Sequence, residues 1–126
     1  MPGALTWYIP DCYWPAQSTP GEYVSHESIC VLNTGDQDAH LHITLYFEDR
    51  APQSGFITNC AAQRTHHVRM DHISDLQGQS IPRGVPYAAL VMSDVPVIVQ
   101  YSRCDVTQPA LTLMTTVAYP VMEGTC

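Results

Sequence analysis

The chain has 126 residues, which is the usual length of a single domain. Its five basic residues are all arginine, and a formal net charge of −7 disfavours binding to nucleic acid or to an anionic membrane surface. Only 13% of the residues are charged, roughly half the usual share, which favours a surface partly covered by other subunits.

The cysteines and the first residues bear on location. Residues 1–7 carry neither the positive charge nor the apolar run of a secretory signal peptide. The five cysteines, the last of which is Cys126, are an odd number with no C-x-x-C pair. We therefore expect reduced thiols and a cytoplasmic protein. The absence of lysine excludes Schiff-base chemistry and a phosphate-binding P-loop, and no cofactor is expected.

Apolar and polar residues alternate with period two in short runs separated by turn residues. This pattern predicts an all-β protein, a single antiparallel β-sandwich domain over residues 1–126 that is jelly-roll-like. Four prolines fall within residues 1–22, which we expect to be a lead-in. Residues 23–32 and 40–47 then form two strands of a hairpin, joined by turn residues at 33–38.

The remaining strands follow in the same way. Residues 71–86 are rich in glycine, proline, glutamine and serine, which predicts a long loop. Residues 93–96 are expected to be a turn between two neighbouring strands. The further strands are expected at 56–60, 65–70, 87–92, 97–103 and 111–119.

His40 and His42 share one face of their strand, because side chains at i and i+2 point the same way. With Glu48 they could hold a metal ion in a cupin-like enzyme, which is the alternative reading. Both spacings depart from the cupin motif and no second motif follows, so a surface role is favoured and no metal site is expected. Since no nucleophile signature is present either, we expect a protein that is not an enzyme.

Two groups of polar residues are candidates for binding. His67 and Arg69 share a strand face that would suit a carboxylate, a phosphate or a polyhydroxy ligand. The competing interpretation is a solvated face with an ion pair nearby. In the second group, polar residues interrupt two apolar strands, and we hypothesise that these residues converge at one end of the sandwich. They are His26, Glu27, Gln100 and Arg103.

Four stretches resemble the sensory rhodopsin transducer family, in the same order and with almost the same spacing. They are Trp7-x-Ile9-x-Asp11-x-Tyr13-x-Pro15, the run 24–39, the run 64–69 and the run 93–100. The resemblance implies a cytoplasmic β-sandwich that assembles as a homotetramer. It also implies a signalling or small-molecule-binding role, with a sugar-like or anionic ligand and, in some members, a membrane receptor as partner.

The resemblance also implies a set of ligand-binding positions. Trp7 and Tyr13 would either contact the ligand or pack in the core, and the sequence leaves both interpretations open. The implied set comprises Trp7, Asp11, Tyr13, His26, Glu27, Arg64, His67, Arg69, Gln100 and Arg103.

Overall fold

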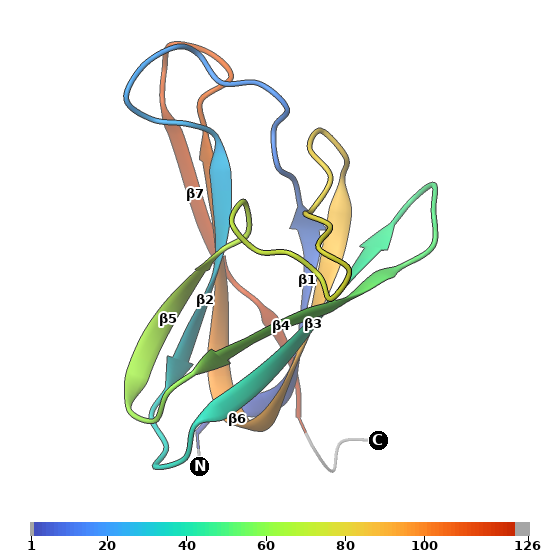
Figure 1. The fold of residues 1–126 in the computed structure, drawn as a ribbon. Helices are drawn as coiled ribbons and strands as arrows, with labels where there is room; N and C mark the ends of the chain where they lie inside the picture. The colour runs from blue at the N-terminus through green and yellow to red at the C-terminus, as the bar shows by residue number, and fades with distance from the viewer. Residues whose placement is uncertain (1, 123–126) are drawn as a thin grey trace.

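A computed structural model describes residues 2–122, so Met1 and residues 123–126, including Cys126, lie outside the described residues. All of the regular structure it describes is β, and all of the strand pairs are antiparallel, which confirms the predicted all-β class (Figure 1). The strands are β1 (Ala4–Cys12), β2 (His26–Asn33), β3 (Ala39–Phe47), β4 (Gln53–Cys60), β5 (Arg64–Arg69), β6 (Tyr87–Asp105), β7 (Thr112–Val117) and β8 (Tyr119–Val121).

The long strand β6 belongs to both layers of the fold. Its first half lies between β1 and β3, and its second half lies between β2 and β7. The first sheet therefore has the order β4-β3-β6-β1-β8, and the second sheet has the order β5-β2-β6-β7 (Figure 1). Apolar side chains from both sheets, such as Ile29, Leu41 and Phe56, are fully buried in one core between them.

The turn predicted at 93–96 is wrong, because β6 continues through it as one strand of 19 residues. Ser93 still pairs with β3, and Val97 already pairs with β1. Pro96 lies between these pairings and has no assigned ladder partner. A proline is tolerated there because its missing N–H is not required by a neighbouring strand.

The structure also corrects the lead-in predicted for residues 1–22, since β1 lies inside the first sheet between β6 and β8. Pro10 is tolerated because the pairing with β6 shifts register between Ile9 and Cys12. Trp7 is buried, and its indole N–H is shared between the carbonyl oxygens of Ala4 and Val97, both at 3.1 Å. Trp7 is therefore a core residue.

The hairpin predicted for residues 23–32 and 40–47 is wrong, because β2 pairs with β5 and β6 in the second sheet, whereas β3 pairs with β4 and β6 in the first. The remaining expected strands and the loop are confirmed with shifted ends. The loop 71–86 contains no strand, only an isolated bridge between Ser74 and Ser80. The strand predicted at 111–119 is divided into β7, which joins the second sheet, and β8, which joins the first. Ala118 lies at the division and is anchored through its N–H to the carbonyl of Val99.

Candidate functional site

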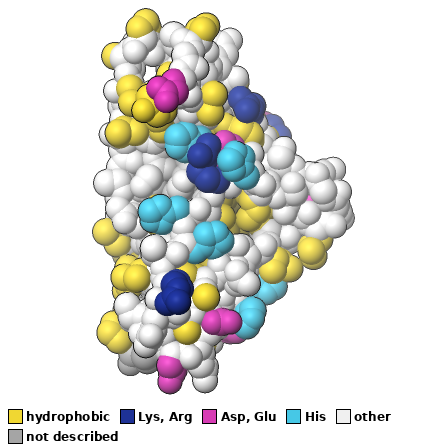
Figure 2. Space-filling view, turned by 60° about the vertical axis from the view of Figure 1, so that its left-hand side comes forward, with side chains coloured by type: hydrophobic (Ala, Val, Ile, Leu, Met, Phe, Trp, Pro, Cys, Tyr) yellow, Lys and Arg dark blue, Asp and Glu magenta, His cyan; other side chains and the backbone are white. Residues whose placement is uncertain are grey.

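The outer surface of the second sheet gathers polar side chains from all four of its strands. Strand register aligns Arg69 with Ser28, Ser28 with Ser102, and Ser102 with Thr115. Figure 2 shows histidine and arginine side chains gathered on the side of the molecule where β5 and β2 lie. We call this surface the histidine–arginine face and define it by His26, Ser28, His67, Arg69, Gln100, Ser102 and Thr115.

A shallow cavity of about 270 Å³ lies on this face, over β2, β6 and β7. His26, Ser28 and Ser102 are among its polar lining residues, and Leu113 of β7 contributes apolar surface. Because Ser28 pairs with Arg69 on β5, the arginine lies beside the cavity. The site could therefore offer hydroxyl, imidazole and guanidinium groups to a single small ligand.

Arg69 is held in place by Asp71, through hydrogen bonds of 2.8 Å from Nε and from Nη2. Partial burial opposes ionisation of Asp71, but the hydrogen bonds and charge of Arg69 outweigh it and hold the pKa of that carboxyl below its usual value. The ion pair of the competing interpretation is thus present. It orients the guanidinium and leaves Nη1 without a hydrogen bond to any residue of 2–122.

The structure separates the four residues expected to converge at one end of the sandwich. Neighbouring residues of a strand point to opposite faces, so His26 lies on the outer face and Glu27 points into the core. Gln100 lies on the outer face with His26. Arg103 lies on the same side of the sheet as Glu27, with which it is paired across the strands. The four side chains therefore form two groups on opposite faces of the sheet and not one site, although Arg103 also lines the cavity that His26 lines.

The inner group is built around the fully buried carboxylate of Glu27. It accepts hydrogen bonds from the hydroxyls of Tyr87 and Tyr101 and from the backbone N–H of Tyr13, the last at 2.9 Å. Arg103 donates from Nε to the Tyr101 hydroxyl at 3.2 Å and contacts exposed Asp11 at 3.5 Å. We call these residues the Glu27 cluster.

Four of the ten predicted positions therefore meet in or beside the Glu27 cluster, namely Asp11, Tyr13, Glu27 and Arg103. Sequence reasoning missed Tyr87 and Tyr101, although a carboxyl in an otherwise apolar strand requires buried donors. Arg64 is not brought to either group. It lies at the start of β5 in the row of Asn33, and its guanidinium binds the carbonyl oxygen of Gln63.

Burial raises the pKa of Glu27 above its ordinary value, against the opposing effects of Tyr101, Tyr87, the Tyr13 N–H and the charge of Arg103. The folded protein therefore holds this proton more tightly than the unfolded chain does. The resulting stabilisation is full below the ordinary pKa near 4.5 and is lost as pH rises through the folded-state pKa.

We accordingly expect the free energy of unfolding of the wild type, relative to Glu27→Gln, to fall as pH rises above about 4.5. Glutamine does not titrate, so the difference between the two proteins isolates this group. Urea denaturation at a series of pH values measures it. A difference that is constant, or that grows with pH, would contradict the assigned direction.

The two histidines of the alternative metal site do share one face of β3. His40 binds Asp94 through its backbone N–H at 2.8 Å and its ring Nδ1 at 2.7 Å. His42 lies between Met92 and Ile57 in the strand register. Across residues 2–122 no group of three or more His, Cys, Asp or Glu side chains is arranged to hold a metal ion.

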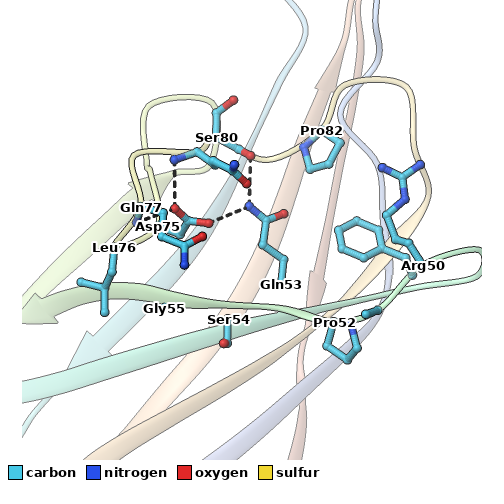
Figure 3. Close-up of a pocket in the computed structure, with 13 residues that line it drawn as sticks. Arg50, Pro52, Gln53, Ser54, Gly55, Asp75, Leu76, Gln77, Ser80 and Pro82 are labelled. Atoms are coloured by element: carbon cyan, nitrogen blue, oxygen red, sulfur yellow. Dashed lines mark hydrogen bonds between the residues drawn. The ribbon is translucent and has the colours of Figure 1, made fainter.

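A larger hollow of about 580 Å³ was not predicted from the sequence. It lies between the loop 71–86 and the start of β4 (Figure 3). The loop is anchored by the carboxylate of Asp75, which accepts the N–H groups of Gln77 and Gln79 at 2.9 Å. The side chain of Gln53 donates to Asp75 at 3.1 Å and to the carbonyl oxygen of Ser80 at 3.3 Å.

The comparison with family models and the comparison with solved structures point to the same family. A family described as the Anabaena sensory rhodopsin transducer matches residues 2–120. The crystal structure of Thermotoga maritima 1070 is 40% identical and has a TM-score of 0.83, covering 96% of this chain and 97% of that one. The Anabaena sensory rhodopsin transducer is 36% identical and has a TM-score of 0.70, covering 79% of this chain and 86% of that one.

No curated protein sequence matches the chain. Within residues 2–122 the structure contains no helix that is long and apolar enough to cross a membrane.

Proposed function

Because this chain belongs to the Anabaena sensory rhodopsin transducer family, we propose that it is a signalling module that binds a small ligand on the histidine–arginine face. The observation that carries the proposal is the cavity over β2, β6 and β7, at which polar side chains of three strands meet. Its volume of about 270 Å³ is close to the lower limit of ligand sites in proteins.

The lining favours a ligand with an anionic group on a hydroxylated body, such as a sugar acid or a sugar phosphate. Ser28 and Ser102 offer hydroxyls that can donate or accept, which suits the hydroxyls of a sugar. Arg69 would bind the anionic group through its free Nη1 edge, since Asp71 already holds the other edge. His26 can contribute its ring Nε2, since its Nδ1 lies 2.8 Å from the carbonyl oxygen of Val24.

Removing the cation tests this site. We expect Arg69→Met and His26→Ala to weaken the binding of glucose 6-phosphate or glucuronate by about tenfold or more, the loss of one charge-assisted hydrogen bond. Protein-observed NMR titration measures the affinity and locates the perturbed amides. Arg64→Met is the matched control, because Arg64 lies outside the face. His26→Ala is included because Arg69→Met deprives the nearly buried Asp71 of its arginine partner. Equal losses in the control would contradict the proposal.

We also infer that the chain assembles with copies of itself, and the resemblance makes a tetramer the expected assembly. Strand β7 supports this inference, because all six of its residues are exposed although it is a strand of the sheet. Leu113 and Val117 are 72% and 68% exposed. Within residues 2–122 only β6 pairs with β7, which carries no charge and no proline to block further pairing.

A second copy of β7 fits this edge with a defined register. An antiparallel pairing about a two-fold axis at Thr115 places Leu113 opposite Val117 of the second copy, on the same side of the extended sheet. Closing a tetramer requires a second contact. The outer surface of the first sheet offers one, because Tyr8, Tyr46 and Met92 are exposed there.

The proposed partner for signalling is a membrane receptor, as the name of the similar Anabaena transducer indicates for that protein. Co-purification with candidate receptors in detergent tests this interaction. Equal retention of the chain on the affinity matrix in a control without receptor would contradict it. A cytoplasmic location is supported by the four free thiols of the described residues.

We propose binding rather than catalysis. Burial, with the charge of Glu27, raises the pKa of the Cys12 thiol, so it stays protonated and is a poor nucleophile. Both oxygens of Glu27 are already occupied by tyrosine hydroxyls. The alternative, a cupin-like enzyme that uses His40 and His42, requires a bound metal, and metal analysis of protein purified without an affinity tag distinguishes the two.

A further inference from the structure

The hollow in Figure 3 lies away from the histidine–arginine face and has the form of a binding cleft. One wall is the loop 71–86, and the other is formed by the end of β3, the connection to β4 and the first residues of β4. Long loops without secondary structure are uncommon in compact domains and often have a binding role. The volume of about 580 Å³ falls within the range of small-molecule sites.

The polar wall of the cleft is preorganised. Asp75 holds the loop through two backbone N–H groups and fixes the amide nitrogen of Gln53. A second bond from that nitrogen to Ser80 locks the orientation of the amide. No residue of 2–122 donates a hydrogen bond to the Gln53 oxygen, which Figure 3 shows turned toward the side where Pro82 and Arg50 lie. A fixed, free acceptor therefore faces the cleft.

The opposite wall carries the aromatic ring of Phe47 and the guanidinium of Arg50, whose charge is balanced by Asp49. The Arg50 guanidinium lies 5.4 Å from the centroid of the Phe47 ring. Its Nε and Nη2 bind Asp49 at 3.0 and 3.2 Å, so Nη1 remains as a donor. Figure 3 shows Pro52 and Pro82 at the margins of the space between this wall and Gln53.

These groups define the chemistry of the occupant. The charged residues that line the cleft are Arg50 and Asp75. The arginine is paired with Asp49, and the carboxylate of Asp75 already accepts three hydrogen bonds. An anionic ligand would find the arginine of the lining already paired with Asp49 and would lie near the carboxylate of Asp75, and an apolar ligand would leave the Gln53 oxygen unpaired. A neutral ligand with many hydroxyls can donate to Gln53, accept from Arg50 and lay an apolar ring face on Phe47 or proline.

We propose that this cleft is a second binding site that takes an uncharged saccharide, independent of the site on the histidine–arginine face. The proposal does not depend on the function assigned to that face, because the two sites share no lining residue.

NMR titration of the full chain with sucrose, maltose and trehalose at millimolar concentrations tests the proposal, with glucose 6-phosphate as the anionic comparison. At least one uncharged disaccharide should perturb the amides of Gln53, Gly55 and Gln79 in a saturable manner, and glucose 6-phosphate should leave these amides unchanged. Arg50→Ala and Gln53→Met should each weaken this binding by about fivefold to tenfold, the loss of one hydrogen bond.

Arg64→Ala is the matched control, because it removes an exposed arginine that lies on β5 and does not line the cleft. Arg50→Ala removes an exposed side chain and keeps the Gln53 anchor of the loop, so it tests the site even if Gln53→Met loosens the loop. His26→Ala should leave saccharide binding unchanged, because His26 lines only the cavity on the histidine–arginine face. This variant therefore tests the two proposed sites separately. The proposal is overturned if no disaccharide perturbs the cleft, or if neither variant weakens a perturbation that is observed.

Discussion

Replacing Glu27 by leucine should destabilise the protein by about 3–5 kcal/mol, although leucine is a good match for the apolar surroundings. The substitution removes the acceptor of the Tyr87 and Tyr101 hydroxyls and of the Tyr13 N–H. The two buried hydroxyls would lose their acceptor, at a cost of about 1–3 kcal/mol each, and the Tyr13 N–H would keep only its longer bond of 3.3 Å to the Tyr101 hydroxyl. Urea denaturation, with unchanged dependence on denaturant concentration, measures the loss.

Glu27→Gln is the matched control for this prediction. The amide keeps one acceptor oxygen and gains an N–H₂ group that can donate a hydrogen bond to a tyrosine hydroxyl. The loss in the free energy of unfolding should therefore be far smaller than for leucine. Tyr87→Phe and Tyr101→Phe remove one donor each and leave the carboxylate in place. If leucine were tolerated within about 1 kcal/mol, the cluster would not hold the two sheets as the hydrogen bonds indicate.

The Glu27 cluster shows which parts of the site could be predicted from the sequence and which could not. Glu27 stood out because polar residues interrupt an apolar strand, but the alternation of side chains along that strand places His26 and Glu27 on opposite faces and argues against their convergence. The donors of Glu27 come from Tyr87 and Tyr101, which lie 60 and 74 residues further along the chain. Their meeting depends on which strands pair, and periodicity carries no information about pairing.

The same limit applies to β6 and to the cleft. Ser93 and Pro96 have the composition of a turn, yet tertiary pairing on both sides keeps the strand continuous. The loop 71–86 was predictable from its glycine and proline content. Its fold over β4, which depends on the contact between Asp75 and Gln53, was not. In contrast, β3 was predicted nearly in full, because alternate residues such as Leu41 and Ile43 are buried on one face only.

The second large effect is expected at β7. Val117→Lys should raise the dissociation constant of the proposed pair of protomers by about 100-fold or more. A two-fold axis introduces the lysine twice, each time opposite Leu113 of the other copy, and a charged edge residue opposes strand addition. Because Val117 is exposed in the single chain, the fold itself should be unaffected. Sedimentation over a range of concentrations measures the constant, and circular dichroism confirms the fold.

The register adds a sharper test of the same interface. A two-fold axis at Thr115 places this residue opposite its own copy, so Thr115→Cys should form an intermolecular disulfide under mild oxidation. Thr116→Cys is the control, because Thr116 would face Met114 of the second copy. Equal cross-linking in the two variants would contradict the register, and assembly that survives Val117→Lys would contradict the interface. Since Leu113, Met114 and Thr115 also line the ligand cavity, assembly that fixes β7 should strengthen ligand binding, and ligand should strengthen assembly by the same factor.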